Sequence, residues 1–256
     1  MTYVGGVPCR IYEPLGYYDS TLVPIVRRLG ATIISIEYQL SPEATFGKAI
    51  EQCESVVHAL HDSEYQKYHI DPTRIAIFGD SAGGNLCAVL AQRALRNGRP
   101  SLFRCQVLIY PVIQMLDMLS PSYRHYYCSY KGTGLLNPRT MARWLLMYLG
   151  IEATLAAAVS EYLTNPDFSP LLGGPLNGLA PAFIATAGVD ILRTEGALYA
   201  RRLHDADVPV EWHDYAQAFH GVIHMPYSRQ RDTIFDDVAD FLRVHLSIDK
   251  TETTSL

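Results

Sequence analysis

Hydrophobic positions along the chain fall into short β-branched runs that alternate with segments of helical spacing. A short apolar run bounded by turn residues indicates a buried strand, and apolar residues three or four positions apart indicate one face of a helix. Strands are therefore predicted at residues 7–13, 31–38, 74–78, 106–110, 181–187 and 208–215. Helices are predicted at residues 21–29, 47–61, 81–97, 194–205 and 233–246. This alternation predicts an α/β fold, with a mostly parallel sheet and helices on both of its faces.

Residues 115–165 break the alternation. They are rich in Met, Leu and Tyr, have helical spacing and contain no strand candidate. We interpret them as a helical lid or cap inserted into a single domain of residues 1–256. In open sheets of this kind, ligands bind beyond the carboxyl ends of the strands.

The composition narrows the class of protein. The 256 residues are 48% hydrophobic and 18% charged, with a formal net charge of −5, which suits a globular chain with a sizeable core. The mild acidic excess gives no electrostatic reason to bind nucleic acid or an anionic membrane. No apolar stretch approaches the ~20 residues of a transmembrane helix, and the first residues do not resemble a signal peptide. We expect a soluble chain, while its compartment and oligomeric state stay open.

The cysteines and histidines give no pattern of a metal site. The five cysteines lie far apart and form no CxxC pair: Cys9, Cys53, Cys87, Cys105 and Cys128. We expect buried free thiols, with one disulfide as the open alternative. His220 and His224 have the i, i+4 spacing of a metal pair, but no third ligand accompanies them. No metal or organic cofactor is therefore expected.

The strongest chemical signal is a serine in a glycine-rich turn. Directly after the strand 74–78 comes Gly79-Asp80-Ser81-Ala82-Gly83-Gly84, which opens the helix 81–97. A tight strand-to-helix turn would expose the Ser81 hydroxyl as a nucleophile, with Gly79 and Gly83 relieving the backbone crowding. The N–H of Ala82 would then face a developing oxyanion. GxSxG alone is a weak pattern, and an incidental turn is the alternative; the strand–turn–helix context favours the nucleophile.

A serine nucleophile needs a base and an orienting acid. Asp190 follows the strand 181–187 and His220 follows the strand 208–215, so both belong to the sheet edge that carries Ser81. The order Ser, Asp, His along the chain suits this type of scaffold. His213 and His224 compete for the role of base, but His213 lies within a strand pattern, which favours packing or solvent exposure.

Several motifs together resemble the α/β-hydrolase superfamily, and within it the hormone-sensitive-lipase and arylacetamide-deacetylase group of carboxylesterases. They are EYQLSPE at residues 37–43, IFGDSAGGNL, LIYPVIQ with SPSY, and AFIATAGVDILRTEGALYARRL. The resemblance covers roughly residues 7–245, and the stretch from LIYPVIQ to PSY is most similar to animal arylacetamide deacetylases and neutral cholesterol ester hydrolases. It implies that Ser81, Asp190 and His220 are nucleophile, acid and base. It also implies that residues 115–165 help to form the lid or acyl pocket.

The chain departs from this family at one position. Between Tyr12-Glu13-Pro14 and Gly16-Tyr17-Tyr18-Asp19 it has only Leu15. Family members carry an apolar strand and His-Gly-Gly-Gly there, a loop that donates N–H groups to the oxyanion hole. Without that central strand, we expect the strand 31–38 to pair directly with the strand 74–78. We also expect weakened catalysis, unless Gly16-Tyr17 supplies a substitute N–H. The hydrophobic anchor of the animal relatives, often in the endoplasmic reticulum, is not found either.

Other residues near the motifs have two interpretations each. Arg193 and Glu195 either hold the acid loop or complement the start of a helix. Asp80 is expected to anchor the turn by bonding to neighbouring backbone, without acid–base chemistry. The aromatic residues at 123–127 either line an acyl pocket or pack within the lid.

The sequence leaves two functions open. The first is a serine carboxylic ester hydrolase that acts on small, uncharged, apolar esters or aryl amides through an acyl-enzyme. The second is a catalytically impaired hydrolase-like protein that binds small apolar ligands or a partner. The intact set of three residues favours the first, and the absent loop favours the second.

Overall fold

A computed structural model of the chain describes residues 2–12, 21–114, 124–125, 136–150, 162 and 164–248. The strands are β1 (Thr2–Val4), β2 (Val7–Tyr12), β3 (Ile33–Ile36), β4 (Ala76–Asp80), β5 (Cys105–Ile109), β6 (Ala182–Val189) and β7 (Val210–Phe219). The helices include α1 (Val23–Leu29), α2 (Lys48–His58), α3 (Ala82–Arg96), α5 (Pro138–Leu149), α7 (Arg193–Asp205) and α8 (Arg229–Leu246).

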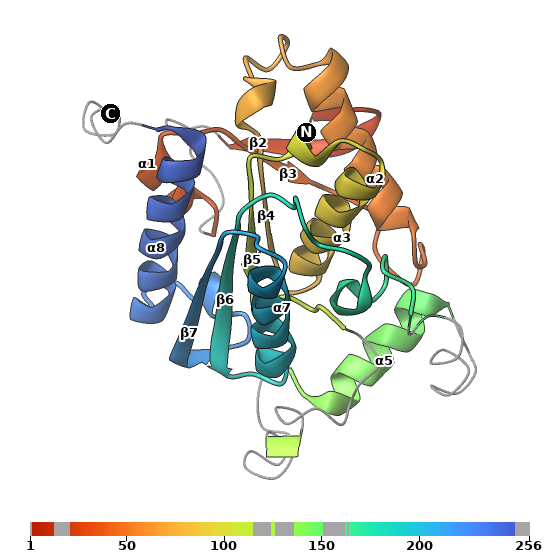
Figure 1. Ribbon diagram of the computed structural model, residues 1–256, viewed down its shortest axis with the longest axis vertical. Coiled ribbons are helices and arrows are strands. Elements are labelled where there is room, and N and C mark those ends of the chain that lie inside the picture. The colour runs from red at the N-terminus through yellow and green to blue at the C-terminus, as the bar shows by residue number, and fades with distance from the viewer. Residues whose placement is uncertain are drawn as a thin grey trace.

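Four of the strands form a parallel sheet in the order β4-β5-β6-β7. Helices α1 and α8 lie on one side of this sheet, and α2, α3 and α7 lie on the other (Figure 1). The predicted fold class, a parallel sheet with helices on both faces, is confirmed. β1 was not among the strands that the pattern predicts.

The core follows the alternation of side chains along the strands. In β5, Val107 and Ile109 pack with the residues of α1 and α8, whereas Leu108 between them packs with those of α2, α3 and α7. In β6, Phe183 and Ile184 divide between the two faces in the same way. A strand buried on both faces needs apolar residues at consecutive positions, which is why these strands are continuous apolar runs in the sequence.

Capping residues set several helix ends. Asn137 accepts a hydrogen bond from the amide of Thr140 at the start of α5, and Ser228 accepts one from the amide of Arg231 at the start of α8. The Ser228 cap explains why α8 begins four residues earlier than its apolar spacing predicts. α5 ends at Leu149, and Gly150 after it has a φ of 66°, a left-handed conformation that glycine adopts readily.

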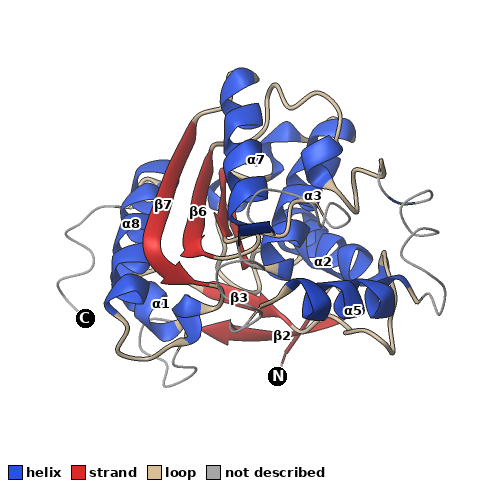
Figure 2. Ribbon diagram, turned by 90° about the horizontal axis from the view of Figure 1, so that it is seen from below, coloured by secondary structure: helices blue, strands red, loops and turns tan. Residues whose placement is uncertain are grey.

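The remaining strands form a separate antiparallel sheet, β1-β2-β3. Among the described residues β3 pairs with β2 only, so the expected direct pairing of the strand 31–38 with the strand 74–78 is wrong. The backbone partners of β3 come from β2 instead, in antiparallel pairing over Cys9–Tyr12. Ile33 contacts the cluster of α1 and α8, and Ile36 contacts the cluster of α2 and α3, so side chains on both faces hold β3 in place. Figure 2 shows β2 and β3 running across the base of the view, below β6 and β7.

α5 lies in the described part of the predicted helical insertion. It buries Met141, Leu145 and Leu149 in a cluster with Ile191 and Leu192, which directly follow Asp190. The helix therefore packs beside the loop at the end of β6. Residues 115–123, 126–135, 151–161 and 163 lie outside the described residues, so the rest of the predicted lid stays a prediction.

Candidate active site

Ser81 lies at the turn between β4, which ends at Asp80, and α3, which begins at Ala82. Its backbone angles, φ 52° and ψ −117°, lie outside the regions that a side-chain-bearing residue favours. Its amide donates to the carbonyl of Ile109 at the end of β5, at 2.9 Å. Backbone strain of this kind clusters at functional sites, and here it occurs directly after β4, at the carboxyl edge of the sheet.

The glycines of this turn differ in what they make room for. A Cβ at Gly79 would lie 2.3 Å from the carbonyl carbon of Gly83, and a Cβ at Gly84 would lie 2.7 Å from the Cβ of Pro111. A Cβ at Gly83 would meet nothing within 4 Å. The steric requirement therefore falls on Gly79 and Gly84. The expectation that a glycine at 83 is needed to relieve a clash is not supported by the geometry.

Three side chains that are far apart in the sequence form one hydrogen-bonded chain. Ser81 Oγ lies 2.8 Å from His220 Nε2, and His220 Nδ1 lies 2.8 Å from Asp190 Oδ2. Asp190 directly follows β6 and His220 directly follows β7, so parallel strands bring both to the sheet edge where β4 delivers Ser81. The structure thus brings together the three residues that the sequence analysis selected.

In this hydrogen-bonded series, the side chains become more buried from His220 to Asp190. The side chain of His220 is 13% exposed and that of Asp190 is 0% exposed. The second carboxylate oxygen of Asp190 accepts the amide N–H of Leu192 at 3.0 Å, which fixes its orientation. A buried, oriented carboxylate can hold an imidazole in one tautomer and stabilise the imidazolium that forms when the ring takes a proton.

The start of α3 supplies polar N–H groups directly after Ser81. Ala82 is the first residue of this helix, which continues for 15 residues. The first amides of a helix lack intrahelical acceptors, and the helix dipole makes this end partly positive. That the amide of Ala82 faces an oxyanion at the Ser81 hydroxyl stays a prediction.

Tyr110 is a residue of the site that the sequence analysis did not single out. Its ring centroid lies 4.8 Å from that of His220, and its hydroxyl donates to Asp80 Oδ2 at 3.4 Å. Its φ is 34°, a second strained residue beside Ser81. Burial, and then the charge of Asp80, raise the pKa of the Tyr110 phenol, which keeps it neutral. Its position at the carboxyl end of a strand, directly before Pro111, was the signal available in the sequence.

The two competing histidines have other contacts. His224 Nε2 lies 2.8 Å from Asp80 Oδ2, and His213 packs against the ring of Phe183 at 5.0 Å between centroids. Asp80 therefore bonds to side chains, Tyr110 and His224, whereas backbone bonds were expected. Among the described residues no group of three or more metal-ligating side chains is found.

Arg193 and Glu195 do not act as a pair on the acid loop. Arg193 forms an ion pair with Asp214 of β7 at 2.6 Å. Glu195 is buried, and its carboxylate accepts the backbone N–H groups of Ile113 at 2.8 Å and Gln114 at 3.3 Å. Burial raises the pKa of Glu195 to about 8, against the lowering effect of these hydrogen bonds. Glu195 thus ties α7 to the segment that follows β5.

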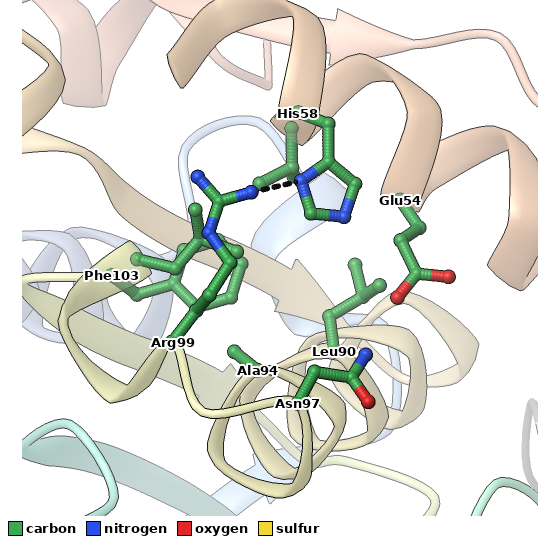
Figure 3. Close-up of a pocket in the computed structure, with 9 residues that line it drawn as sticks. Glu54, His58, Leu90, Ala94, Asn97, Arg99 and Phe103 are labelled. Carbon is green, nitrogen blue, oxygen red and sulfur yellow. Dashed lines mark hydrogen bonds between the residues drawn. The ribbon is translucent and has the colours of Figure 1, made fainter. Parts of the chain in front are cut away.

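A small pocket lies at the other end of α3. It is lined by apolar side chains of α2, α3 and the turn after them, with His58 and Arg99 at its rim, where Arg99 Nη1 and His58 Nδ1 lie 2.7 Å apart (Figure 3). Asn97, also at the rim, follows the last residue of α3, and Ser81 precedes its first. At 1.5 Å per residue the two ends are separated by about 24 Å, so this pocket is not part of the Ser81 site.

The described cysteines are buried free thiols: Cys9, Cys53, Cys87 and Cys105. Burial raises the pKa of both Cys53 and Cys105 to about 12, so neither is a reactive thiolate. Cys128, the aromatic residues 123 and 126–127, and the position of Leu15 lie outside the described residues. The absence of the His-Gly-Gly-Gly loop is thus a feature of the sequence alone. No helix within the described ranges combines the length and apolar character needed to cross a membrane.

Comparisons with known proteins agree with this geometry. A family model described as alpha/beta hydrolase fold matches residues 5–224. Neutral cholesterol ester hydrolase 1 of Mus musculus is 30% identical over 267 residues, covering 81% of this chain and 63% of that protein. Arylacetamide deacetylase of Rattus norvegicus is 30% identical over 258 residues, covering 82% of this chain and 64% of that protein. The chain therefore spans less than two thirds of the length of these relatives.

Solved structures give the same result. EstE1, described as a thermostable carboxylesterase cloned from a metagenomic library, superposes with a TM-score of 0.82 at 28% identity, covering 95% of this chain and 86% of the other. A hyperthermophilic esterase from Pyrobaculum calidifontis superposes with a TM-score of 0.78 at 30% identity, covering 90% of this chain and 71% of the other. The resemblance that the sequence motifs indicated is confirmed.

Proposed function

Because the chain belongs to the alpha/beta hydrolase fold family, with carboxylesterases and deacetylases among its relatives, we propose that it is a serine carboxylic ester hydrolase. The observation that carries the proposal is the hydrogen-bonded series Ser81, His220 and Asp190, with 2.8 Å at each contact. In this proposal Ser81 is the nucleophile, His220 the general base and Asp190 the orienting acid.

The proposed reaction has two halves. Ser81 Oγ attacks the ester carbonyl while His220 Nε2 takes its proton, and the resulting imidazolium is stabilised by Asp190. His220 then gives this proton to the departing alcohol, or to the amine of an aryl amide, which leaves an acyl group on Ser81. In the second half, His220 takes a proton from water, the hydroxide attacks the acyl carbonyl, and the acid leaves as Ser81 regains its proton. Each residue returns to its starting state, so the chemistry requires no metal or organic cofactor.

The oxyanion hole sets the expected rate. In this proposal the N–H of Ala82 stabilises the negative oxygen of the tetrahedral intermediate. The loop that donates further N–H groups in the family is not found in the sequence. Loss of one such donor lowers kcat by about 10²–10³-fold. We therefore expect slow turnover, well below that of an esterase with a complete oxyanion hole.

The proposed substrates are small, uncharged and apolar esters or aryl amides. The names of two relatives, neutral cholesterol ester hydrolase 1 and arylacetamide deacetylase, point to this class.

Hydrolysis of p-nitrophenyl butyrate by the purified chain tests the proposal. The wild type should release p-nitrophenol slowly, and Ser81→Ala should reduce the rate to that of buffer alone. Both proteins should show the same circular dichroism spectrum. A folded wild-type chain that hydrolyses no faster than Ser81→Ala would overturn the proposal and favour a hydrolase-like protein that binds a ligand or a partner.

A further inference from the structure

Two side-chain contacts, not one, join the turn of Ser81 to the loop of His220. The first is the contact of Ser81 with His220. The second runs between their neighbours, since Asp80 precedes Ser81 and its Oδ2 lies 2.8 Å from Nε2 of His224. The other ring nitrogen of His224 lies 3.5 Å from Oγ1 of Thr21. The His224 ring therefore has a polar partner on each nitrogen, which defines its orientation.

Tyr110 links this second contact to the reacting histidine. Its hydroxyl donates to the same Oδ2 of Asp80 that faces His224, and its ring lies against the ring of His220. A displacement of the Asp80 carboxylate would thus be transmitted to the ring that packs on His220. The same oxygen atom, Asp80 Oδ2, therefore contacts both Tyr110 at the end of β5 and His224 in the turn after β7.

The backbone between His220 and His224 allows movement that such a contact would restrict. Gly221, directly after His220, has a φ of 85°, a conformation that glycine adopts at little cost and leaves as easily. Val222 and Ile223 are buried in the core and anchor the next turn. These apolar anchors fix the depth of the turn, and the contact of His224 with Asp80 adds a directional link across the sheet edge.

We propose that His224 is a positioning residue, which acts through Asp80 to hold the His220 ring within hydrogen-bonding reach of Ser81. The proposal rests on the proposed hydrolase function. In this role His224 takes no part in the chemical steps. It sets the geometry of the group that does, and a misplacement on the scale of 1 Å can cost up to about 10²-fold in rate.

The side chains of His224 and Asp80 are 48% and 29% exposed, so their contact adds little to global stability. His224→Ala should therefore lower kcat for p-nitrophenyl butyrate by about 10-fold while KM changes less than about twofold. The Tm should shift by no more than about 3 °C. His224→Gln places an amide donor near the former Nε2 and should recover most of the lost kcat. His204→Ala is the matched control, since His204 is an exposed histidine at the end of α7 that also faces an aspartate.

A double-mutant cycle tests the route through Asp80. In an Asp80→Ala background, His224→Ala should cause no further loss of kcat, because the partner is already gone. Equal losses in the two backgrounds would overturn the proposed route. If Asp80→Ala does not fold, the kcat of His224→Gln tests the proposal instead. A His224→Gln enzyme as slow as His224→Ala would overturn the proposal, and so would a His224→Ala enzyme with the wild-type kcat.

Proton NMR keeps this proposal separate from the proposed function. The imidazole N–H that joins His220 to Asp190 should give a low-field resonance that is missing in His220→Ala. We expect His224→Ala to broaden or shift this resonance and His204→Ala to leave it unchanged. If His224→Ala changes the resonance but the wild-type chain shows no turnover, the positioning role is supported and the proposed hydrolase function is rejected. An unchanged resonance in His224→Ala would reject the positioning role whatever the activity.

Discussion

At the scale of single residues, His220 lies between a hydroxyl and a carboxylate, each 2.8 Å from one of its ring nitrogens. A neutral imidazole has one donor and one acceptor nitrogen. With Nδ1–H donated to Asp190, Nε2 is left to accept the proton of Ser81. The two contacts thus select the tautomer that a general base requires.

Replacing His220 by alanine should therefore remove general-base catalysis. We expect kcat for p-nitrophenyl butyrate to fall by about 10²–10⁴-fold, measured under substrate saturation. His213→Ala is the control, because His213 packs on Phe183 away from the hydrogen-bonded series. A His220→Ala enzyme with the wild-type rate would remove His220 from the site.

The glycines at the Ser81 turn give a second prediction at this scale. Gly79→Ala would place a Cβ 2.3 Å from the backbone of Gly83, which cannot give way as a flexible side chain could. Overpacking of this kind costs about 1–3 kcal/mol of unfolding free energy. Gly83→Ala meets nothing within 4 Å and adds a helix-favouring residue, so its stability should equal or exceed that of the wild type. Urea unfolding of both variants checks this, and equal destabilisation would contradict it.

At the scale of elements, Glu195 connects α7 to the segment that follows β5. Its carboxylate is buried, and its pKa is raised to about 8 by burial, with a further contribution from the charge of Asp190. Between the ordinary carboxyl pKa and 8, the folded chain holds this proton while the unfolded chain has released it. The contribution of Glu195 to stability is therefore full at low pH and is lost as the pH rises toward 8.

Glu195→Gln should remove this pH dependence, because glutamine resembles the protonated side chain at every pH. Relative to the wild type, the unfolding free energy of the variant should rise by about 2 kcal/mol between pH 6 and pH 8. Denaturant unfolding of both proteins at the two pH values measures the difference, in which the other titrating groups cancel. A constant difference between the proteins would show that Glu195 does not titrate in this range.

The elements also show what the sequence could and could not predict. β5 and β6 are apolar at consecutive positions, so the sequence pattern predicts that both faces of these strands are buried. The pattern does not predict the pairing of β3, because periodicity shows which faces a strand buries and not which strand lies beside it. Ile33 and Ile36 fit the pattern of a buried strand whichever neighbour β3 has. The Ser81 turn was predictable because its chemistry is local, whereas the contact of Tyr110 with His220 depends on the ends of two different strands, β5 and β7, coming together.

At the scale of the whole molecule, the strands form two sheets, and we expect their backbone amides to differ in protection against hydrogen exchange. β5 has a hydrogen-bonded neighbour on each side, β4 and β6. β3 has one such neighbour, β2, among the described residues. We expect backbone amides of residues 33–36 to exchange with deuterium at least about 10-fold faster than those of residues 105–109. Mass spectrometry of peptides over the two strands measures this. Equal protection would mean that the free edge of β3 is paired.

The central claim, that Ser81 is an activated nucleophile, can be measured without a chromogenic substrate. A fluorophosphonate reacts with a serine that an adjacent base activates, and it adds a fixed mass to the chain. After incubation, peptide mapping should find one adduct, on Ser81, and none in His220→Ala treated in the same way. A folded wild-type chain that stays unmodified, or an adduct on a different serine, would contradict the account.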